Sequence, residues 1–141
     1  MDTARTLVPA PVVYKASRKT RLGAIYFGST SPAMDEALDL LNAGGIPLDA
    51  MRLRAFPFPD EVTEFIAAHD EVFVVEQNRD AQMRTLLMNE LNVDPMKLIP
   101  ILHYDGTPIT ARFISGAITR HVHAEIVAPK RGSRTAKETV K

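Results

Sequence analysis

Hydrophobic and polar residues between positions 22 and 127 are arranged in short apolar runs, each followed by a longer segment with helical spacing. The runs Leu22–Phe27 and Val72–Val75 are almost wholly apolar, which is typical of parallel strands covered on both faces. Residues Asp49–Ala55 alternate apolar and charged side chains, and Leu98–Tyr104 is a further run interrupted by a proline. The pattern therefore predicts four strands in this part of the chain.

Between and after these runs, apolar residues recur at spacings of three and four, which predicts amphipathic helices. We expect them over Pro32–Gly44, Pro59–His69, Ala81–Leu91 and Thr110–Glu125. Ser31 is expected to cap the first helix, ahead of a proline that suits the first helical turn. Strands that alternate with helices in this way favour right-handed crossovers and a mainly parallel sheet with helices on both faces.

The two ends of the chain differ from the middle. Residues 1–21 contain two prolines and show little periodicity, so we interpret them as a basic linker or edge segment, with a short edge strand at Val12–Tyr14. Residues 128–141 have almost no large apolar side chains and are predicted to be a disordered basic tail. The α/β domain is accordingly expected over 22–127.

The composition narrows the classes of function. With 141 residues, 45% hydrophobic and 24% charged, the chain suits one globular domain. It has no cysteine, which excludes disulfides, thiolate zinc sites and iron–sulfur clusters ligated by cysteine. No apolar run approaches the roughly 18–20 residues that span a bilayer, and no secretory signal opens the chain. We therefore expect a cytoplasmic protein that does not contact a membrane.

The net charge of zero hides an uneven distribution. Each of the two end segments has five basic residues and one acidic residue, so the middle carries the compensating negative charge. Basic ends could contact nucleic acid or an acidic protein. They lack the interleaved aromatic residues on which bases stack, so solvated ends without a nucleic-acid partner are expected.

Two polar loops are the candidate sites, because useful loops of a parallel sheet lie beyond the carboxyl ends of its strands. The first comprises Gly28, Ser29, Thr30 and Ser31, where a glycine turn and three hydroxyl groups precede a helix N-terminus. The loop matches neither of the glycine-rich phosphate-binding motifs, G-x-G-x-x-G and G-x-x-x-x-G-K-[ST]. A turn with a helix cap and a contact with an anion or a partner both remain open interpretations.

The second loop follows the buried Val72–Val75 run and contains a dense set of polar residues: Glu76, Gln77, Asn78, Arg79 and Asp80. Glu76 could act as a base or as a hydrogen-bond acceptor, and Asn78 or Asp80 could cap the next helix. Arg79 is the residue best suited to pair with an acidic group. The loop contains no nucleophile–base pair. Two interpretations therefore remain: its residues cap the next helix and form a polar network at the surface, or they have a direct chemical role.

Catalytic and metal-binding residues are not expected elsewhere. The four histidines are scattered, and His121 and His123, two positions apart on a predicted helix, point to different faces. Without a third ligand in view, the pattern does not indicate a metal site. No G-x-S-x-G elbow is present either.

Four segments together resemble one family. They are GAIYFGSTSPAMDEAL from Gly23, LNAGGIPLDAMRLRAFPFPDEV from Leu41, VFVVEQNRDAQMRTLL from Val72 and LIPILHYDGTPITARFI from Leu98. In order and spacing they resemble the C-terminal domain of the alpha subunit of 2-oxoacid:ferredoxin oxidoreductases, with the 2-oxoglutarate branch most similar. More loosely, the chain is similar to the transketolase C-terminal domain.

The resemblance implies a three-layer α/β/α sandwich with a mixed, mainly parallel five-stranded sheet, whose fifth strand Val12–Tyr14 could supply. It implies an enzyme that decarboxylates a 2-oxoacid oxidatively with coenzyme A and reduces ferredoxin, using thiamine diphosphate, magnesium and iron–sulfur clusters. The partners implied are a pyrimidine-binding domain of the alpha subunit, a thiamine-binding beta subunit and ferredoxin. Self-association or hetero-oligomerisation is also expected.

In this reading the chain itself is non-catalytic. It lacks the thiamine diphosphate-binding motif of the family, a G-D-G stretch followed by an asparagine. The resemblance also implies that the glutamate that activates the cofactor belongs to the pyrimidine-binding domain, so Glu76 does not have that role. The domain would then serve subunit packing and shape the active site, either as a fragment or as a separately encoded piece. The family often has glycine where Ala81 stands, so the path of that loop is open. Two alternatives are a free-standing interaction module and a small anion-binding domain that uses residues 28–31.

Overall fold

The computed structural model describes residues 8–127 of the chain. The tail predicted at 128–141 lies outside the described residues. The described residues form five strands, namely β1 (Val12–Tyr14), β2 (Leu22–Phe27), β3 (Asp49–Leu53), β4 (Glu71–Glu76) and β5 (Leu98–Leu102). They make one sheet in the order β1-β3-β2-β4-β5. Three neighbouring pairs are parallel and β1 pairs antiparallel with β3, which confirms the mixed, mainly parallel five-stranded sheet.

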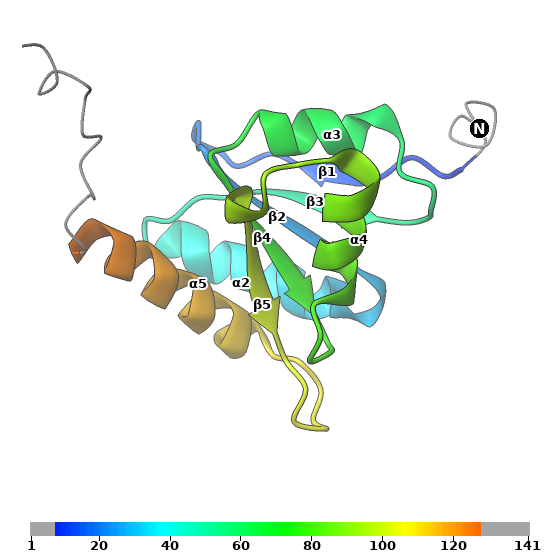
Figure 1. Ribbon diagram of the computed structural model, residues 1–141. Helices are drawn as coiled ribbons and strands as arrows, with labels where there is room; N and C mark the ends of the chain where they lie inside the picture. Colours follow the sequence, from blue (N-terminus) through cyan, green and yellow to red (C-terminus); the bar gives the residue numbers. More distant parts are fainter. Residues whose placement is uncertain (1–7, 128–141) are drawn as a thin grey trace, which may run out of the picture.

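Four α-helices cover the two faces of this sheet. They are α2 (Ser31–Ala43), α3 (Asp60–Ala67), α4 (Gln82–Leu91) and α5 (Ala111–Val127), and the 3-10 turns η1 (Gly28–Thr30) and η2 (Pro95–Lys97) precede α2 and β5. Figure 1 shows α2 and α5 on one side of the sheet and α3 and α4 on the other. The three-layer α/β/α architecture expected from the sequence is thus confirmed.

Successive side chains of a strand point to opposite faces of the sheet, so the hydrophobic core consists of two parts, one on each face. In β2, Ala24 and Tyr26 face α2 and α5, whereas Ile25 faces α3 and α4, and all three side chains are fully buried. Gly23 has no space for a larger side chain, because a Cβ atom there would lie 2.9 Å from Cε1 of Phe65. The central strand therefore begins where α3 approaches the sheet closely.

Several local expectations were wrong. The strand expected over Asp49–Ala55 ends earlier, at Leu53. Ser31 does not cap α2, because it is the first residue of that helix, and Gly28 (φ +64°) already begins the preceding 3-10 turn. The last strand is shorter than expected and ends at Leu102. Pro100 is tolerated within it because β5 is an edge strand, paired only with β4.

Candidate functional site

The two candidate loops lie side by side at the carboxyl edge of the sheet. The neighbouring strands β2 and β4 are parallel, yet the chain leaves β2 toward β3 on one side and continues from β4 toward β5 on the other. Ligands of open α/β sheets bind at such a point, where the strand order reverses. Here η1 follows β2, and residues 77–81 follow β4.

Gln77 joins these two loops. Its side-chain amide donates hydrogen bonds to the hydroxyl oxygens of Ser29 and Thr30, both with nitrogen–oxygen distances of 3.1 Å. Thr30 is buried, whereas Gly28, Ser29 and Gln77 are exposed. Gln77 is therefore brought together with Ser29 and Thr30, whose hydroxyl oxygens already accept hydrogen bonds from the protein.

Glu76 is not a loop residue but the last residue of β4, and its side chain is fully buried. One carboxylate oxygen accepts from the backbone N–H of Met83 (2.6 Å) and from Nδ2 of Asn78 (3.0 Å). The other accepts from the backbone N–H of Arg84 at 3.1 Å. A negative charge at a helix N-terminus is stabilised by the free N–H groups and the helix dipole. Glu76 therefore fixes α4, and its oxygen atoms are not presented to a substrate.

Asn78 completes the start of α4, as one of the two predicted capping residues. Its Oδ1 accepts from the backbone N–H of Gln82 at 3.3 Å. Ala81, at the N-cap position, adopts the left-handed conformation with φ +50° and ψ +49°. This conformation favours glycine, which gives a physical reason for the glycine that the resembling family often has there.

Arg79 and Asp80 project from the tip of the second loop. Their side chains are 76% and 65% exposed, and Nε of Arg79 lies 3.3 Å from Oδ1 of Asp80. An exposed neighbouring ion pair contributes little to stability. These two residues are thus among the charged groups of the carboxyl edge that a partner protein could reach.

An apolar pocket of about 250 Å³ adjoins Gly28, and the sequence analysis did not select it. It is lined by Phe27, Gly28, Leu53, Arg54, Ala55, Phe56 and Met83. Phe56 is 54% exposed and packs edge-on against Phe58, with ring centroids 5.4 Å apart. The signal in the sequence was the run Phe56-Pro57-Phe58-Pro59 after the second strand, which was noted only as part of the resemblance.

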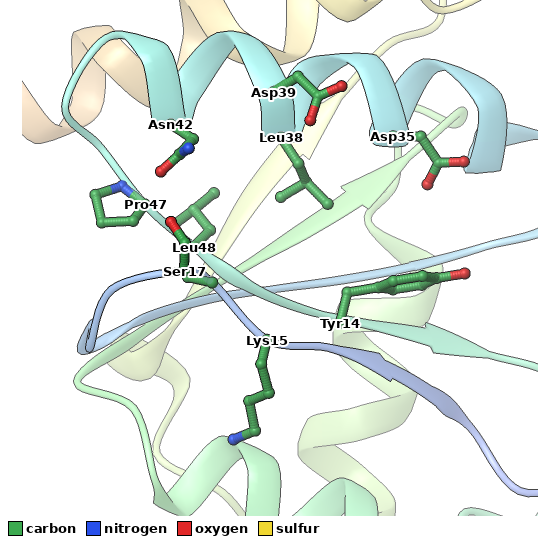
Figure 2. Close-up of a pocket in the computed structure, with 10 residues that line it drawn as sticks. Tyr14, Lys15, Ser17, Asp35, Leu38, Asp39, Asn42, Pro47 and Leu48 are labelled. Atoms are coloured by element: carbon green, nitrogen blue, oxygen red, sulfur yellow. The ribbon is translucent and has the colours of Figure 1, made fainter.

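A larger hollow of about 380 Å³ lies away from this edge, between β1 and α2 (Figure 2). Asp35 and Asp39 line it from α2, and Tyr14 lines it from β1. Tyr26 does not line the hollow but is fully buried in β2, and this burial, with Tyr14 and Asp35 as smaller causes, raises its pKa to about 12. The residues that line the hollow include the acidic Asp35 and Asp39 but no nucleophile paired with a base.

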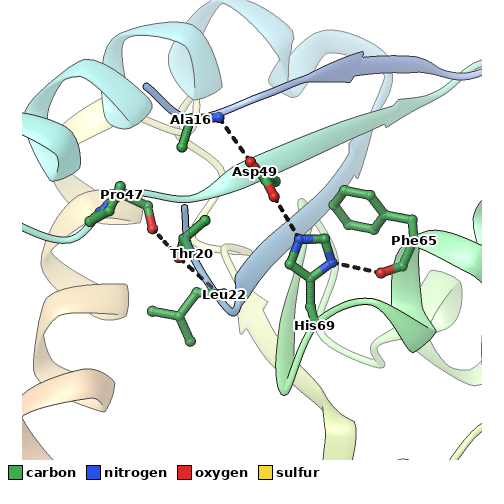
Figure 3. Close-up of polar contacts among 7 residues, drawn as sticks. All are labelled: Ala16, Thr20, Leu22, Pro47, Asp49, Phe65 and His69. Atoms are coloured by element: carbon green, nitrogen blue, oxygen red, sulfur yellow. Dashed lines mark hydrogen bonds and ion pairs between the residues drawn. The ribbon is translucent and has the colours of Figure 1, made fainter. Parts of the chain in front are cut away.

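A buried polar network holds the amino edge of the sheet (Figure 3). Nε2 of His69 lies 2.8 Å from Oδ2 of Asp49, and Nδ1 lies 2.6 Å from the carbonyl oxygen of Phe65. Oδ1 of Asp49 accepts from the backbone N–H of Ala16 at 2.8 Å. Both ring nitrogens are occupied, so His69 connects three segments and is not placed to act as a base.

The residues described do not fit the cofactors that the resemblance implies for the whole enzyme. Glu76 cannot reach an aminopyrimidine ring, because its carboxylate is buried against the N-terminus of α4. The chain has no cysteine to ligate an iron–sulfur cluster. Within residues 8–127, no helix is both long and apolar enough to cross a membrane.

Comparisons with known proteins place the fold. No family model and no curated protein sequence matches the chain. Among solved structures, it is similar to a 2-oxoglutarate:ferredoxin oxidoreductase from Magnetococcus marinus with 2-oxoglutarate, coenzyme A and succinyl-CoA bound (TM-score 0.75, 24% identity). That match covers 86% of this chain and 21% of the other.

Two further structures have the same fold. The alpha chain of a probable 2-oxoacid ferredoxin oxidoreductase from Thermoplasma acidophilum matches with a TM-score of 0.54 and 22% identity, over 81% of this chain and 97% of that one. A split-gene transketolase, described as an inactive beta4 tetramer, matches with a TM-score of 0.64 and 18% identity, over 80% of this chain and 41% of that one.

The structural neighbours are thus 2-oxoacid:ferredoxin oxidoreductases and a transketolase, as the resemblance in the sequence implied. At these identities the matches establish a transketolase C-terminal-like fold. The chain spans only 21% and 41% of two of these neighbours, and nearly all of the third.

Proposed function

We propose that this chain is the non-catalytic, transketolase C-terminal-like domain of the alpha subunit of a cytoplasmic, thiamine-diphosphate-dependent 2-oxoacid:ferredoxin oxidoreductase. The 2-oxoacid is 2-oxoglutarate, which would be decarboxylated oxidatively with coenzyme A while ferredoxin is reduced. The domain packs against the pyrimidine-binding domain of the alpha subunit and the thiamine-binding beta subunit. It shapes the approach to an active site formed by those parts.

The observation that supports this role is the pair of loops joined by Gln77 at the carboxyl edge of β2 and β4. The side chains of Ser29, Thr30 and Gln77 hydrogen-bond to one another. The carboxylate of Glu76 accepts hydrogen bonds from backbone N–H groups of α4. The exposed side chains of this edge include the charged Arg79 and Asp80 and the aromatic Phe56. Such a combination suits contact with another protein surface better than chemistry within this chain.

In this proposal thiamine diphosphate, magnesium and the iron–sulfur clusters belong to the other parts of the enzyme. Residues 22–127 form the packing domain, residues 1–21 act as a basic linker or edge segment, and residues 128–141 as a basic tail. The exposed apolar surface around Phe56 would normally be covered by neighbouring domains. In the isolated chain it would favour association with a second copy or with other subunits.

The test is purification of the tagged full chain from its native host, followed by mass spectrometry of co-eluting chains. The preparation is then assayed for reduction of a viologen dye that depends on both 2-oxoglutarate and coenzyme A. We expect co-elution with a thiamine-binding chain and 2-oxoacid-dependent activity. A chain that elutes alone, in a preparation without that activity, would overturn the proposal.

The alternative of a free-standing interaction module is favoured by one observation, the exposed Phe56 beside the apolar pocket. It predicts stable protein partners in the same preparation, none of them thiamine-binding, and no oxidation of 2-oxoacids. The anion-binding alternative is tested by titrating the purified chain with phosphate, thiamine diphosphate and coenzyme A. Saturable binding that is lost in Ser29→Ala would support it, and the absence of saturation would remove it.

A further inference from the structure

Three ligating side chains converge at the amino end of β4, at the opposite end of that strand from Glu76. Nε2 of His121 lies 2.7 Å from Oε2 of Glu71 and 3.4 Å from Oε1 of Glu125. The nitrogen and the carboxylate oxygens all lie within 4.8 Å of one another. Glu71 opens β4, whereas His121 and Glu125 are four residues apart on α5. Two elements therefore present ligands to one point.

This cluster contains more negative charge than its own imidazole neutralises, because a fully protonated His121 still faces two carboxylates. The carboxylate oxygens of Glu71 and Glu125 lie within 4.8 Å of one another, so two ionised carboxylates at this point would repel each other. A divalent cation would neutralise both of them and use the lone pair of a neutral imidazole.

The ligands are also held in place before any ion arrives. The rings of the buried Phe73 and of His121 pack edge to face, with an interplanar angle of 88° and centroids 5.3 Å apart. The side chains of Glu71 and His121 are 19% and 28% exposed, while that of Glu125 is 54% exposed. The site is therefore supported from the core and open on one side, through which an ion and water could enter.

We propose that Glu71, His121 and Glu125 bind one divalent ion of the zinc class, with a fourth position occupied by water. One imidazole nitrogen with two carboxylate oxygens is a donor set that Zn²⁺ accepts, and three protein ligands leave one tetrahedral position open. Ligand atoms ~2.1 Å from a tetrahedral ion are about 3.4 Å apart. The His121–Glu125 spacing already has this value, and the His121–Glu71 contact has to open by less than about 1 Å.

The bound ion links the first residue of β4 to the last two turns of α5. Beyond Val122 the side chains of α5 are exposed, so the described part of this helix end has few apolar contacts. The sequence did not indicate the site, because Glu71 and His121 are separated by 50 positions. The site lies at the edge opposite the loops of the proposed function and does not depend on it.

The test uses the full chain, freed of metal with a chelator and titrated with Zn²⁺ alone by isothermal calorimetry, and with Mg²⁺ as the comparison ion. Thermal unfolding is recorded for both states. His121→Asn and Glu125→Gln remove ligands, and His123→Asn is the matched control, because it removes an exposed histidine of the same helix. Circular dichroism of the metal-free variants verifies that they fold.

We expect one Zn²⁺ per chain, a higher unfolding temperature with zinc and weaker binding of Mg²⁺. Affinity should fall at least about tenfold in His121→Asn and in Glu125→Gln, because even the loss of a group that only supports a metal ligand costs about that much. His123→Asn should bind like the parent chain. The absence of saturable Zn²⁺ binding, or an equal loss in all three variants, would overturn the proposal.

Discussion

The imidazole of His69 lies 2.8 Å from the carboxylate of Asp49, and the two residues come from the end of α3 and the start of β3. The other ring nitrogen faces a backbone carbonyl, which can only accept, so it must carry a proton. The pair is buried, and it therefore acts as a polar link between α3 and β3 inside the fold.

Asp49→Asn should lower the free energy of unfolding by roughly 2–4 kcal/mol, because it leaves a buried polar partner without its carboxylate and weakens the acceptor of Ala16. Urea unfolding at neutral pH measures this change. Asp39→Asn is the control, since Asp39 is exposed, and its effect should stay within about 0.5 kcal/mol. Equal effects of the two substitutions would contradict the role assigned to Asp49.

Glu76→Gln should destabilise the chain by about 1–3 kcal/mol, because the charge-assisted bonds to the N-terminus of α4 become weaker and one oxygen is replaced by a donor. Asp80→Asn in the same loop is the matched control and should change stability little, because Asp80 is exposed. Amide hydrogen exchange of Met83 and Arg84 locates the effect. Unchanged protection there would contradict the capping role.

Ala81→Gly should raise stability by up to about 1 kcal/mol, because it relieves a left-handed backbone conformation that disfavours a side chain. The same substitution at Ala33, inside α2, should lower stability by about 1 kcal/mol. Unfolding midpoints in urea compare the two variants with the parent chain. A destabilised Ala81→Gly variant would indicate a different conformation at this position.

The exposed pair of Arg21 and Asp70 predicts a pH dependence. Two hydrogen bonds of 2.6 Å join their side chains, and the guanidinium lowers the pKa of Asp70. The unfolded chain then binds the proton more readily, so the pair stabilises the fold above the unfolded pKa and this contribution disappears as pH falls through the folded pKa. Arg21→Gln should therefore be less stable than the parent at neutral pH and equal to it in acid. Arg18→Gln should show no such convergence, and neither difference should be large, because both side chains of the pair are exposed.

The fold was predictable from the sequence because each element has a local signal. Apolar runs marked β2 and β4, helical spacing marked the four helices, and the alternation of both indicated parallel crossovers. The contact between the two candidate loops followed from topology, since the carboxyl ends of neighbouring parallel strands share an edge. What the sequence showed less well was the direction of individual side chains within that edge.

Glu76 illustrates this limit. Its place after an apolar run suggested a loop carboxylate, yet β4 continues by one residue and turns the side chain inward, where α4 supplies its donors. The clusters around His69 and His121 were missed for a different reason. Their partners Asp49 and Glu71 are distant in the sequence, and only the packing of helices onto the sheet brings them together.

The apolar pocket beside Gly28 provides a last prediction. Phe56 is exposed and contacts Phe58 edge-on, so its removal costs the isolated fold little but removes apolar surface from the carboxyl edge. Phe56→Ser should therefore unfold at nearly the parent urea concentration, and it should weaken self-association or assembly with partner subunits. Gel filtration over a range of concentrations measures that association.

Met96→Ser is the matched control, because Met96 is even more exposed, at 82%, but precedes β5 at the opposite edge of the sheet. If the carboxyl edge is the contact surface, Met96→Ser should elute like the parent chain while Phe56→Ser shifts toward the monomer. Two results together would show that partner proteins do not bind at the carboxyl edge. The parent chain would be monomeric at all concentrations, and its assemblies with partner subunits would still form with Phe56→Ser. The comparison therefore tests the location of the contact surface separately from the identity of the enzyme.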